Sequence, residues 1–444
     1  MHVLSREKEL KIHTHRGFNI MSKTRNNIRF DLSDYLIHFF RDVDLNSNSF
    51  IHLPEYCGFN NNHHHSAIDA KYLLRLSLRH YKLFASWSYR NGVRTIYGYD
   101  PAVCFTDMPI SAYLQSGTDR LLKSEKIGLY ALALPKSNMF SAGARPVIYA
   151  LDGSSRITYQ HGNGDERIIN EVLLPLVEQY RYVTYAPGVI DWSHEREWRW
   201  PYRGDVTEYL SEIETDGIVE DIEKIPCLNL KNVELSECGV IVQFNADVKE
   251  ITHDILTLID QGVTHQKTFK FIISVEKLNS FDSILHPHEL VEHINSNAII
   301  FDDFFDIPSE RIKCYAREIN GYIDDLYSNE DYFTDTYGSE FGNAWVWIHD
   351  NQNEVTRALI QGGLVSVNNE GKYLLKIDLS WDCWPLRKKE ELAKYVSTWL
   401  RNRFNLESCY FSVLGSNNCN DFPNYNDKLD INHPYYNNTR EIDW

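Results

Sequence analysis

The chain has 444 residues, of which 43% are hydrophobic, enough to fill the cores of two or three domains of ordinary size. Its formal net charge of −17 argues against broad, sequence-independent binding to nucleic acid or to an anionic membrane, although a local basic groove would not show in that sum. The eight cysteines are scattered without a CxxC pair, which argues against a disulfide framework or a zinc ribbon.

Residues 1–30 are expected to form a basic, flexible N-terminal extension. They contain no apolar segment of signal-peptide type, and no later run approaches the roughly 20 apolar residues of a membrane span. We therefore expect a cytoplasmic protein that has no membrane partner.

The first predicted strand lies in DLSDYLIHFF, residues 31–40, where apolar side chains alternate between two faces. A helix is expected at about residues 67–86, capped by Ser66, because leucines recur there at helical spacing. Short strands separated by Gly-, Pro- and Ser-rich turns follow at residues 102–110, 127–134 and 145–151.

Residues 165–183 predict a helix that Pro175 kinks or breaks, and DWSHEREWRWP, residues 191–201, predicts a strand. A strand, a helix and a strand then follow at residues 238–244, 248–261 and 270–275. Strands interrupted by helices at irregular spacing indicate an α+β fold rather than a doubly wound sheet.

We place a domain boundary near residue 280, because the sequence then becomes rich in helices. This gives a first domain at residues 31–280 and a smaller, helix-rich α+β domain at residues 281–444. The elements expected in the second domain are helices at residues 286–296, 308–328, 351–363 and 388–404, and strands at residues 371–381 and 408–415. The Asn-, Asp- and Tyr-rich tail is expected to extend over the surface.

The strand at residues 191–201 carries unusual charge. Because side chains alternate along a strand, Glu195, Glu197 and Arg199 would share one face. Two interpretations stay open: the wall of a polar cleft, or an exposed edge strand protected by its charges.

Other polar residues stand at strand ends or inside apolar strands. Thr106 and Asp107 end an apolar strand, where they either contact a ligand or satisfy a turn. Arg145, four residues before Tyr149, can bind a phosphate or pair with a carboxylate of the protein. His38 stands alone in an apolar strand, where a structural role is the commoner one.

The sequence contains no P-loop, GxSxG or HExxH motif. The run His63, His64 and His65, near Cys57, could bind a metal, but it lies among asparagines and no second ligand cluster follows it. We favour a solvated loop there and expect no metal.

Four segments in order, YLIHFF, YGYDPAVCFTDMPI, IGLYALALPKSNMFSAGARPVIYA and WSHEREWRW, resemble the bacterial abortive phage infection family called AbiGi and its relatives. The resemblance covers roughly residues 30–250. The same order is similar to the split-sheet fold of ADP-ribosyltransferases, which implies that the first domain is catalytic and uses NAD as its substrate without a metal.

The ADP-ribosyltransferase resemblance also implies roles for single residues. His38 would hold the adenosine ribose, Tyr97 or Tyr149 would pack against nicotinamide, and either Glu197 or Glu195 would be the catalytic acid. Arg145 would contact the pyrophosphate or the acceptor. Together with Thr106 and Asp107 at their strand end and Arg199 beside the glutamates, the residues expected to bind NAD are His38, Tyr97, Thr106, Asp107, Arg145, Tyr149 and Arg199.

The expected function is therefore an intracellular toxin of anti-phage defence that transfers ADP-ribose from NAD to a protein or nucleic acid. A phage component or an antitoxin would be a further partner, and the second domain would select the target or hold the enzyme inactive. Two alternatives stay open. One is a non-catalytic, antitoxin-like protein that binds a partner, and the other is a nuclease whose magnesium is held by Asp107, Glu195 and Glu197.

Overall fold

The first unit of the protein is built around one sheet of eight strands. The structure is a computed structural model. It describes residues 32–44, 53–54, 67–90, 93–122, 128–150, 158–159, 167–186, 188, 191–216, 219–278, 287–328, 339–377 and 384–438. The strands of the sheet are β1 (Tyr35–Phe40), β7 (Ala102–Thr106), β8 (Tyr130–Pro135), β9 (Arg145–Pro146), β14 (Glu197–Pro201), β16 (Cys238–Val242), β17 (Phe269–Ser274) and β18 (Ile299–Ile300).

The sheet has the order β18-β17-β16-β8-β1-β7-β14-β9. Its neighbouring strands are antiparallel except β16 and β17, which are parallel and are connected through helix α6 (Val248–Asp260). The first unit thus contains one large mixed sheet. A parallel pair, β10 (Ile148–Ala150) and β13 (Tyr182–Thr184), forms a separate small sheet.

Helices cover both faces of the large sheet. Leu36 and Phe40 of β1 belong to the core shared with α2 (Ala70–His80) and α6, whereas Tyr35 and Ile37 belong to the core shared with α3 (Ile110–Leu122) and α7 (Pro287–Asn297). The predicted alternation of β1 and the α+β class are therefore confirmed.

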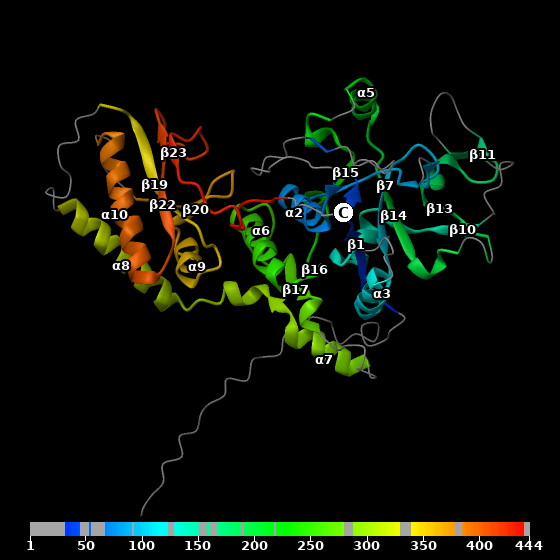
Figure 1. Ribbon diagram of the computed structural model, residues 1–444, viewed down its shortest axis with the longest axis horizontal. Helices are drawn as coiled ribbons and strands as arrows, with labels where there is room; N and C mark the ends of the chain where they lie inside the picture. Colours follow the sequence, from blue (N-terminus) through cyan, green and yellow to red (C-terminus); the bar gives the residue numbers. More distant parts are fainter. Residues whose placement is uncertain are drawn as a thin grey trace, which may run out of the picture.

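The second unit is a five-stranded antiparallel sheet covered by helices (Figure 1). Its strand order is β20-β21-β19-β22-β23. Its elements are α8 (Ser309–Ser328), β19 (Gly342–Ile348), α9 (Glu354–Gln361), β20 (Val365–Val367), β21 (Tyr373–Leu375), α10 (Leu386–Phe404), β22 (Ser408–Leu414) and β23 (Tyr425–Asn426).

The boundary between the units lies about 25 residues later than predicted. Ile294 of α7 and Phe301 are buried in the cores of the first unit, and β18 hydrogen-bonds to β17. The first unit therefore extends to about residue 305, and the second begins with α8. A two-residue edge strand has no periodicity to read, so the sequence does not reveal it.

Polar contacts join the two units through α6 and the C-terminal tail. Arg357 forms a buried ion pair with Asp260 of α6, and the Asn351 amide donates to the backbone oxygen of His253. The tail is not merely extended over the surface, since Tyr435 and Asn437 are buried. Figure 1 shows α6 between the two sheets.

The predicted helix at residues 165–183 was wrong. The chain there forms β12 (Ile168–Ile169), a 3-10 helix at Leu176–Arg181 and then β13. Pro175 has no backbone N–H, so it cannot continue a helix from the preceding residues, and it is the N-cap of the 3-10 helix. The buried Gln179 side chain hydrogen-bonds to the backbone N–H and oxygen of Ile169, replacing helical hydrogen bonds.

Helix α2 is shorter than predicted, beginning after Asp69, whose carboxylate accepts from the backbone N–H of Tyr72 at 2.6 Å. The proposed cap Ser66 lies outside the described residues, as do the N-terminal extension, Cys57 and the histidines 63–65.

Candidate functional site

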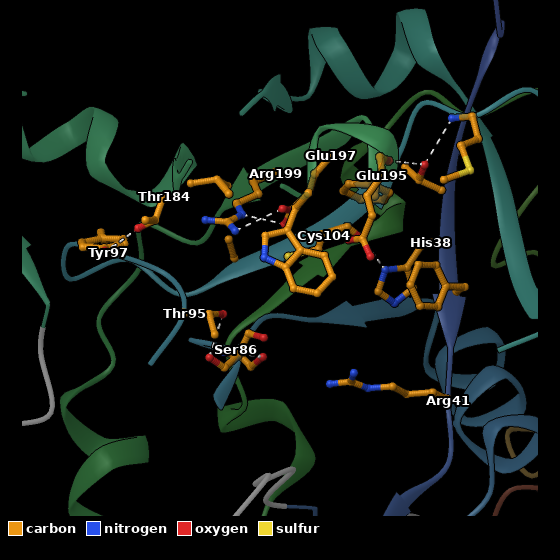
Figure 2. A pocket seen from close by; sticks show the side chains of 18 of the residues that line it. His38, Arg41, Ser86, Thr95, Tyr97, Cys104, Thr184, Glu195, Glu197 and Arg199 are labelled. Atoms are coloured by element: carbon orange, nitrogen blue, oxygen red, sulfur yellow. Dashed lines mark hydrogen bonds and ion pairs between the residues drawn. The ribbon is translucent and has the colours of Figure 1, made fainter. Parts of the chain in front are cut away.

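A cavity of about 580 Å³ opens beside β1, β7 and β14. It receives side chains from segments far apart in the sequence, and Figure 2 shows Glu195, Glu197 and Arg199 on one side of it with Ser86 and Thr95 on another. The predicted residues that line it are His38, Tyr97, Thr106, Glu195, Glu197 and Arg199.

Glu197 is held in the cavity by Arg199. The two residues are two positions apart on β14, so their side chains share one face of the strand. The Arg199 Nε lies 2.8 Å from one Glu197 oxygen and a terminal nitrogen lies 3.2 Å from the other, which is a bidentate pair. Arg199 also donates to the backbone oxygens of Tyr180 and Tyr182, so the Glu197 carboxylate has a rigid support.

Arg199 is itself deeply buried, with 4% of its surface exposed. Burial alone would lower the pKa of its guanidinium, but the Glu197 carboxylate more than offsets this, and the pKa is raised. Arg199 therefore carries its charge permanently next to Glu197.

Glu195 reaches the same cavity by a different route from the one predicted. The strand begins only at Glu197, and residues 193–195 form a 3-10 turn. Arg196 has a φ of 47°, in the left-handed region, and this interrupts the alternation. The Thr106 hydroxyl donates to the backbone oxygen of Glu195 at 2.6 Å, and Arg120 lies 3.4 Å from the Glu195 carboxylate.

His38 is a neutral ring with a defined tautomer. Its Nδ1 lies 2.8 Å from the backbone oxygen of Cys104, and because a carbonyl only accepts, Nδ1 carries the hydrogen. Nε2 is then an acceptor. Burial lowers the pKa of His38 to about 4, against the opposing effect of the Cys104 hydrogen bond.

We expect the pKa of His38 to make folding stability depend on pH in a defined window. Between about pH 6.5, the ordinary value, and about pH 4, the unfolded chain binds a proton at this residue that the folded protein does not. The contribution of His38 to stability is therefore lost as pH falls through this window. Urea midpoints at several pH values should fall less steeply in His38→Gln than in the wild type. Equal slopes, or an NMR titration of His38 near pH 6.5, would contradict this.

Tyr97 and Arg167 form one wall. Tyr97 is 1% exposed, and its hydroxyl lies 2.9 Å from that of Thr184. The Arg167 guanidinium lies 4.2 Å from the centre of the Tyr97 ring and donates to its hydroxyl. The ring is thus held by a cation–π contact and by two hydrogen bonds.

Three arginines that were not predicted from the sequence also line the cavity: Arg41, Arg120 and Arg167. Arg41 directly follows β1, Arg120 lies in the last turn of α3, and Arg167 directly precedes β12. For Arg41 and Arg120, a position at the end of a helix or strand was a weak signal. Nothing local in the sequence brings Arg167 to Tyr97, which is 70 residues away.

Three predicted site residues do not line the cavity. Both carboxylate oxygens of Asp107 lie 2.7 Å from the Lys136 amine. The Arg145 guanidinium stacks on the Phe140 ring at 4.0 Å and donates to backbone oxygens. The Tyr149 hydroxyl donates to the backbone oxygen of Trp192 at 3.1 Å. Asp107, Arg145 and Tyr149 therefore contact neighbouring groups of the protein and are not part of the cavity wall.

No group of three or more His, Cys, Asp or Glu side chains that could hold a metal ion occurs among the described residues. Asp107 is paired with Lys136, whereas Glu195 and Glu197 line the cavity. The magnesium ligand set of the nuclease alternative is therefore not assembled in the part of the chain that the structure describes.

The fold and the site together define an α+β protein with a polar cavity that contains two glutamates, a neutral histidine and several arginines. The family described as "Protein of unknown function (DUF4427)" matches residues 307–438, which lie in the second unit and are less than a third of the chain. No curated protein and no solved structure matches the chain. Within the described residues, no helix is long and apolar enough to cross a membrane.

Proposed function

We propose that the first unit is an ADP-ribosyltransferase-like domain that transfers ADP-ribose from NAD to a macromolecule. The observation that carries this proposal is the Glu197 carboxylate, held by a buried arginine at the wall of a cavity that also contains a neutral histidine and three further arginines. The resemblance of the four sequence segments points to the same chemistry.

The chemistry requires a carboxylate beside a sugar. When the bond between nicotinamide and ribose breaks, its electron pair leaves with nicotinamide and positive charge develops on the ribose. A fixed carboxylate stabilises that charge more than it stabilises the uncharged bond, which lowers the barrier. Glu197 meets this requirement because its ion pair with Arg199 leaves it little freedom to move.

A second carboxylate suits the transfer step. The acceptor attacks the anomeric carbon of the ribose and must lose a proton, and Glu195 lines the same cavity to receive it. The ion pair of Glu195 with Arg120, at 3.4 Å, is longer and more exposed to solvent than that of Glu197 with Arg199, which is compatible with proton exchange at Glu195. Glu197 would thus act on the sugar, and Glu195 on the acceptor.

The remaining lining residues suit a dinucleotide. Guanidinium groups bind phosphates in a forked geometry, and Arg41, Arg120 and Arg167 line the cavity. The Nε2 of His38 is an acceptor for a ribose hydroxyl. A volume of about 580 Å³ lies within the roughly 300–1,000 Å³ of small-molecule sites.

The experiment is transfer of label from NAD, carried on the adenylate phosphate, to total cell protein, RNA and DNA. Wild type is compared with a folded Glu195→Gln/Glu197→Gln variant. Label on one polymer with the wild type alone is the expected result and identifies the acceptor class. Intact NAD and no label on any polymer, with or without phage infection, would overturn the proposal and favour the partner-binding alternative.

We also place this activity in anti-phage defence as a toxin, on the resemblance alone. Cells that express the chain should then stop growing on infection before phage are released, and cells with the double glutamate variant should not.

A further inference from the structure

The turn between the two glutamates is strained and needs support from its surroundings. Arg196 occupies the left-handed region with a φ of 47°, which residues with a side chain adopt at a cost in free energy. Such a conformation persists only where neighbouring contacts hold it. The residues that hold Arg196 therefore determine where Glu195 points relative to Glu197.

Asp107 contacts this turn through both its backbone and its side chain. Its backbone N–H donates to the Arg196 oxygen at 3.0 Å, and its carboxylate lies 3.6 Å from the Arg196 guanidinium. Asp107 is 7% exposed and makes its closest contacts with Lys136, at 2.7 Å from each carboxylate oxygen. The adjacent Thr106 hydroxyl binds the backbone oxygen of Glu195.

Lys136 extends this support to the centre of the sheet. It directly follows β8, its backbone N–H donates to the Asp34 oxygen at 2.8 Å, and its amine lies 5.4 Å from the centre of the Trp198 ring on β14. The Lys136 and Asp107 pair thus ties the ends of β7 and β8 to the turn that precedes β14.

From these contacts we infer that Asp107, supported by Lys136, is a positioning residue that fixes the direction of the Glu195 carboxylate. In this role Asp107 acts through the turn and not through a contact with the substrate, since it is not among the residues that line the cavity. Without the left-handed turn, strand alternation would set Glu195 roughly 7 Å along the strand from Glu197 on an extended backbone. The turn instead removes Glu195 from the strand and places it against Arg120.

The kinetic consequence rests on the proposed function. Asp107→Asn keeps the shape and the backbone N–H but removes the charge that holds the turn. We expect it to lower kcat for ADP-ribose transfer by about 10-fold to 100-fold, because small displacements of a catalytic group have effects of this size. The KM for NAD should stay within about 2-fold, since no NAD contact is lost.

Two substitutions of Arg196 distinguish the effect of its left-handed backbone conformation from the effect of its side chain. Glycine adopts the left-handed region readily, so Arg196→Gly should keep most of the activity. Valine is strongly disfavoured there, so Arg196→Val should lose as much activity as Asp107→Asn. If Arg196→Gly is as inactive as Arg196→Val, or if Asp107→Asn raises the KM for NAD and leaves kcat unchanged, the inference is wrong.

Amide hydrogen exchange tests the conformation of the turn independently of any enzymatic activity. The Asp107 N–H should be protected in the wild type and in Arg196→Gly, and should exchange faster in Arg196→Val and, at position 107, in Asp107→Asn. This pattern in a protein that does not consume NAD would uphold the positioning role while the proposed function fails. Equal exchange in all four proteins would overturn the positioning role itself.

Discussion

Glu197→Gln is expected to lower the rate of NAD cleavage by about 10²-fold to 10³-fold, the usual effect of removing one group that stabilises charge in a transition state. The amide keeps the shape of the carboxylate but cannot offset the positive charge on the ribose. The measurement is release of nicotinamide at saturating NAD. The KM should change little, because the proposed function assigns NAD binding mainly to His38 and the other arginines of the cavity.

The substitution also leaves the buried Arg199 without its anionic partner, and this can lower stability by about 3–5 kcal/mol. Loss of activity must therefore be separated from loss of folding. The double variant Glu197→Gln/Arg199→Met removes both charges and should regain stability, because replacing a whole buried pair is often neutral. It should remain inactive, which would show that the carboxylate and not the fold is needed.

A matched control is Glu178→Gln. Glu178 is also paired with an arginine, Arg181, but it does not line the cavity. Its turnover should equal that of the wild type. Turnover by Glu197→Gln above a tenth of the wild-type rate would reject Glu197 as the catalytic acid, and Glu195→Gln would then be tested for the same loss.

The parts of the fold that were predictable are those with regular side-chain patterns. The strand, helix and strand at β16, α6 and β17 follow the predicted ranges closely, and so do α8 and β22. The predicted helix at residues 165–183 failed because its helical pattern was overridden by Pro175 and by the hydrogen bonds of the buried Gln179 side chain. Such a replacement of backbone hydrogen bonds by a side chain has no signature in a single sequence.

The candidate site was predictable where its chemistry is local. Glu197 and Arg199 are two residues apart on one strand, so alternation brings them together. The pairing of Asp107 with Lys136 was not predictable, because the two residues are 29 positions apart and only the sheet order joins their strand ends. The left-handed conformation of Arg196 was also hidden, since arginine is not a residue that signals it.

Arg75→Met is expected to lower the free energy of unfolding by about 3–5 kcal/mol, because it removes one partner of a buried ionic network. Arg75 of α2 is 2% exposed. Its nitrogens lie 2.7 and 3.0 Å from the oxygens of Asp254 and 3.1 Å from Glu250. It also donates to the backbone oxygens of Pro434 and Tyr436, so it ties the C-terminal tail to the first unit.

The measurement is urea unfolding followed by circular dichroism, together with limited proteolysis of the tail. Arg75→Met should unfold at lower urea and should be cleaved faster near residue 434, because the carbonyl contacts of the tail are lost. Arg387→Met is the control: Arg387 lies on α10 with 65% of its side chain exposed, and its substitution should change stability by no more than about 0.5 kcal/mol.

The pH dependence gives an independent check on the same network. Burial alone would raise the pKa of Asp254, but Arg75 and Arg79 more than offset this and hold it far below its usual value. A depressed folded-state pKa contributes stability above the unfolded value of about 3.9, and this contribution is lost as pH falls below it. The wild type should therefore lose stability below pH 4 more steeply than Arg75→Met, in which Asp254 keeps its contacts with Arg79 and His253 but loses both hydrogen bonds from Arg75. Equal acid slopes in the two proteins would show that Asp254 does not depend on Arg75.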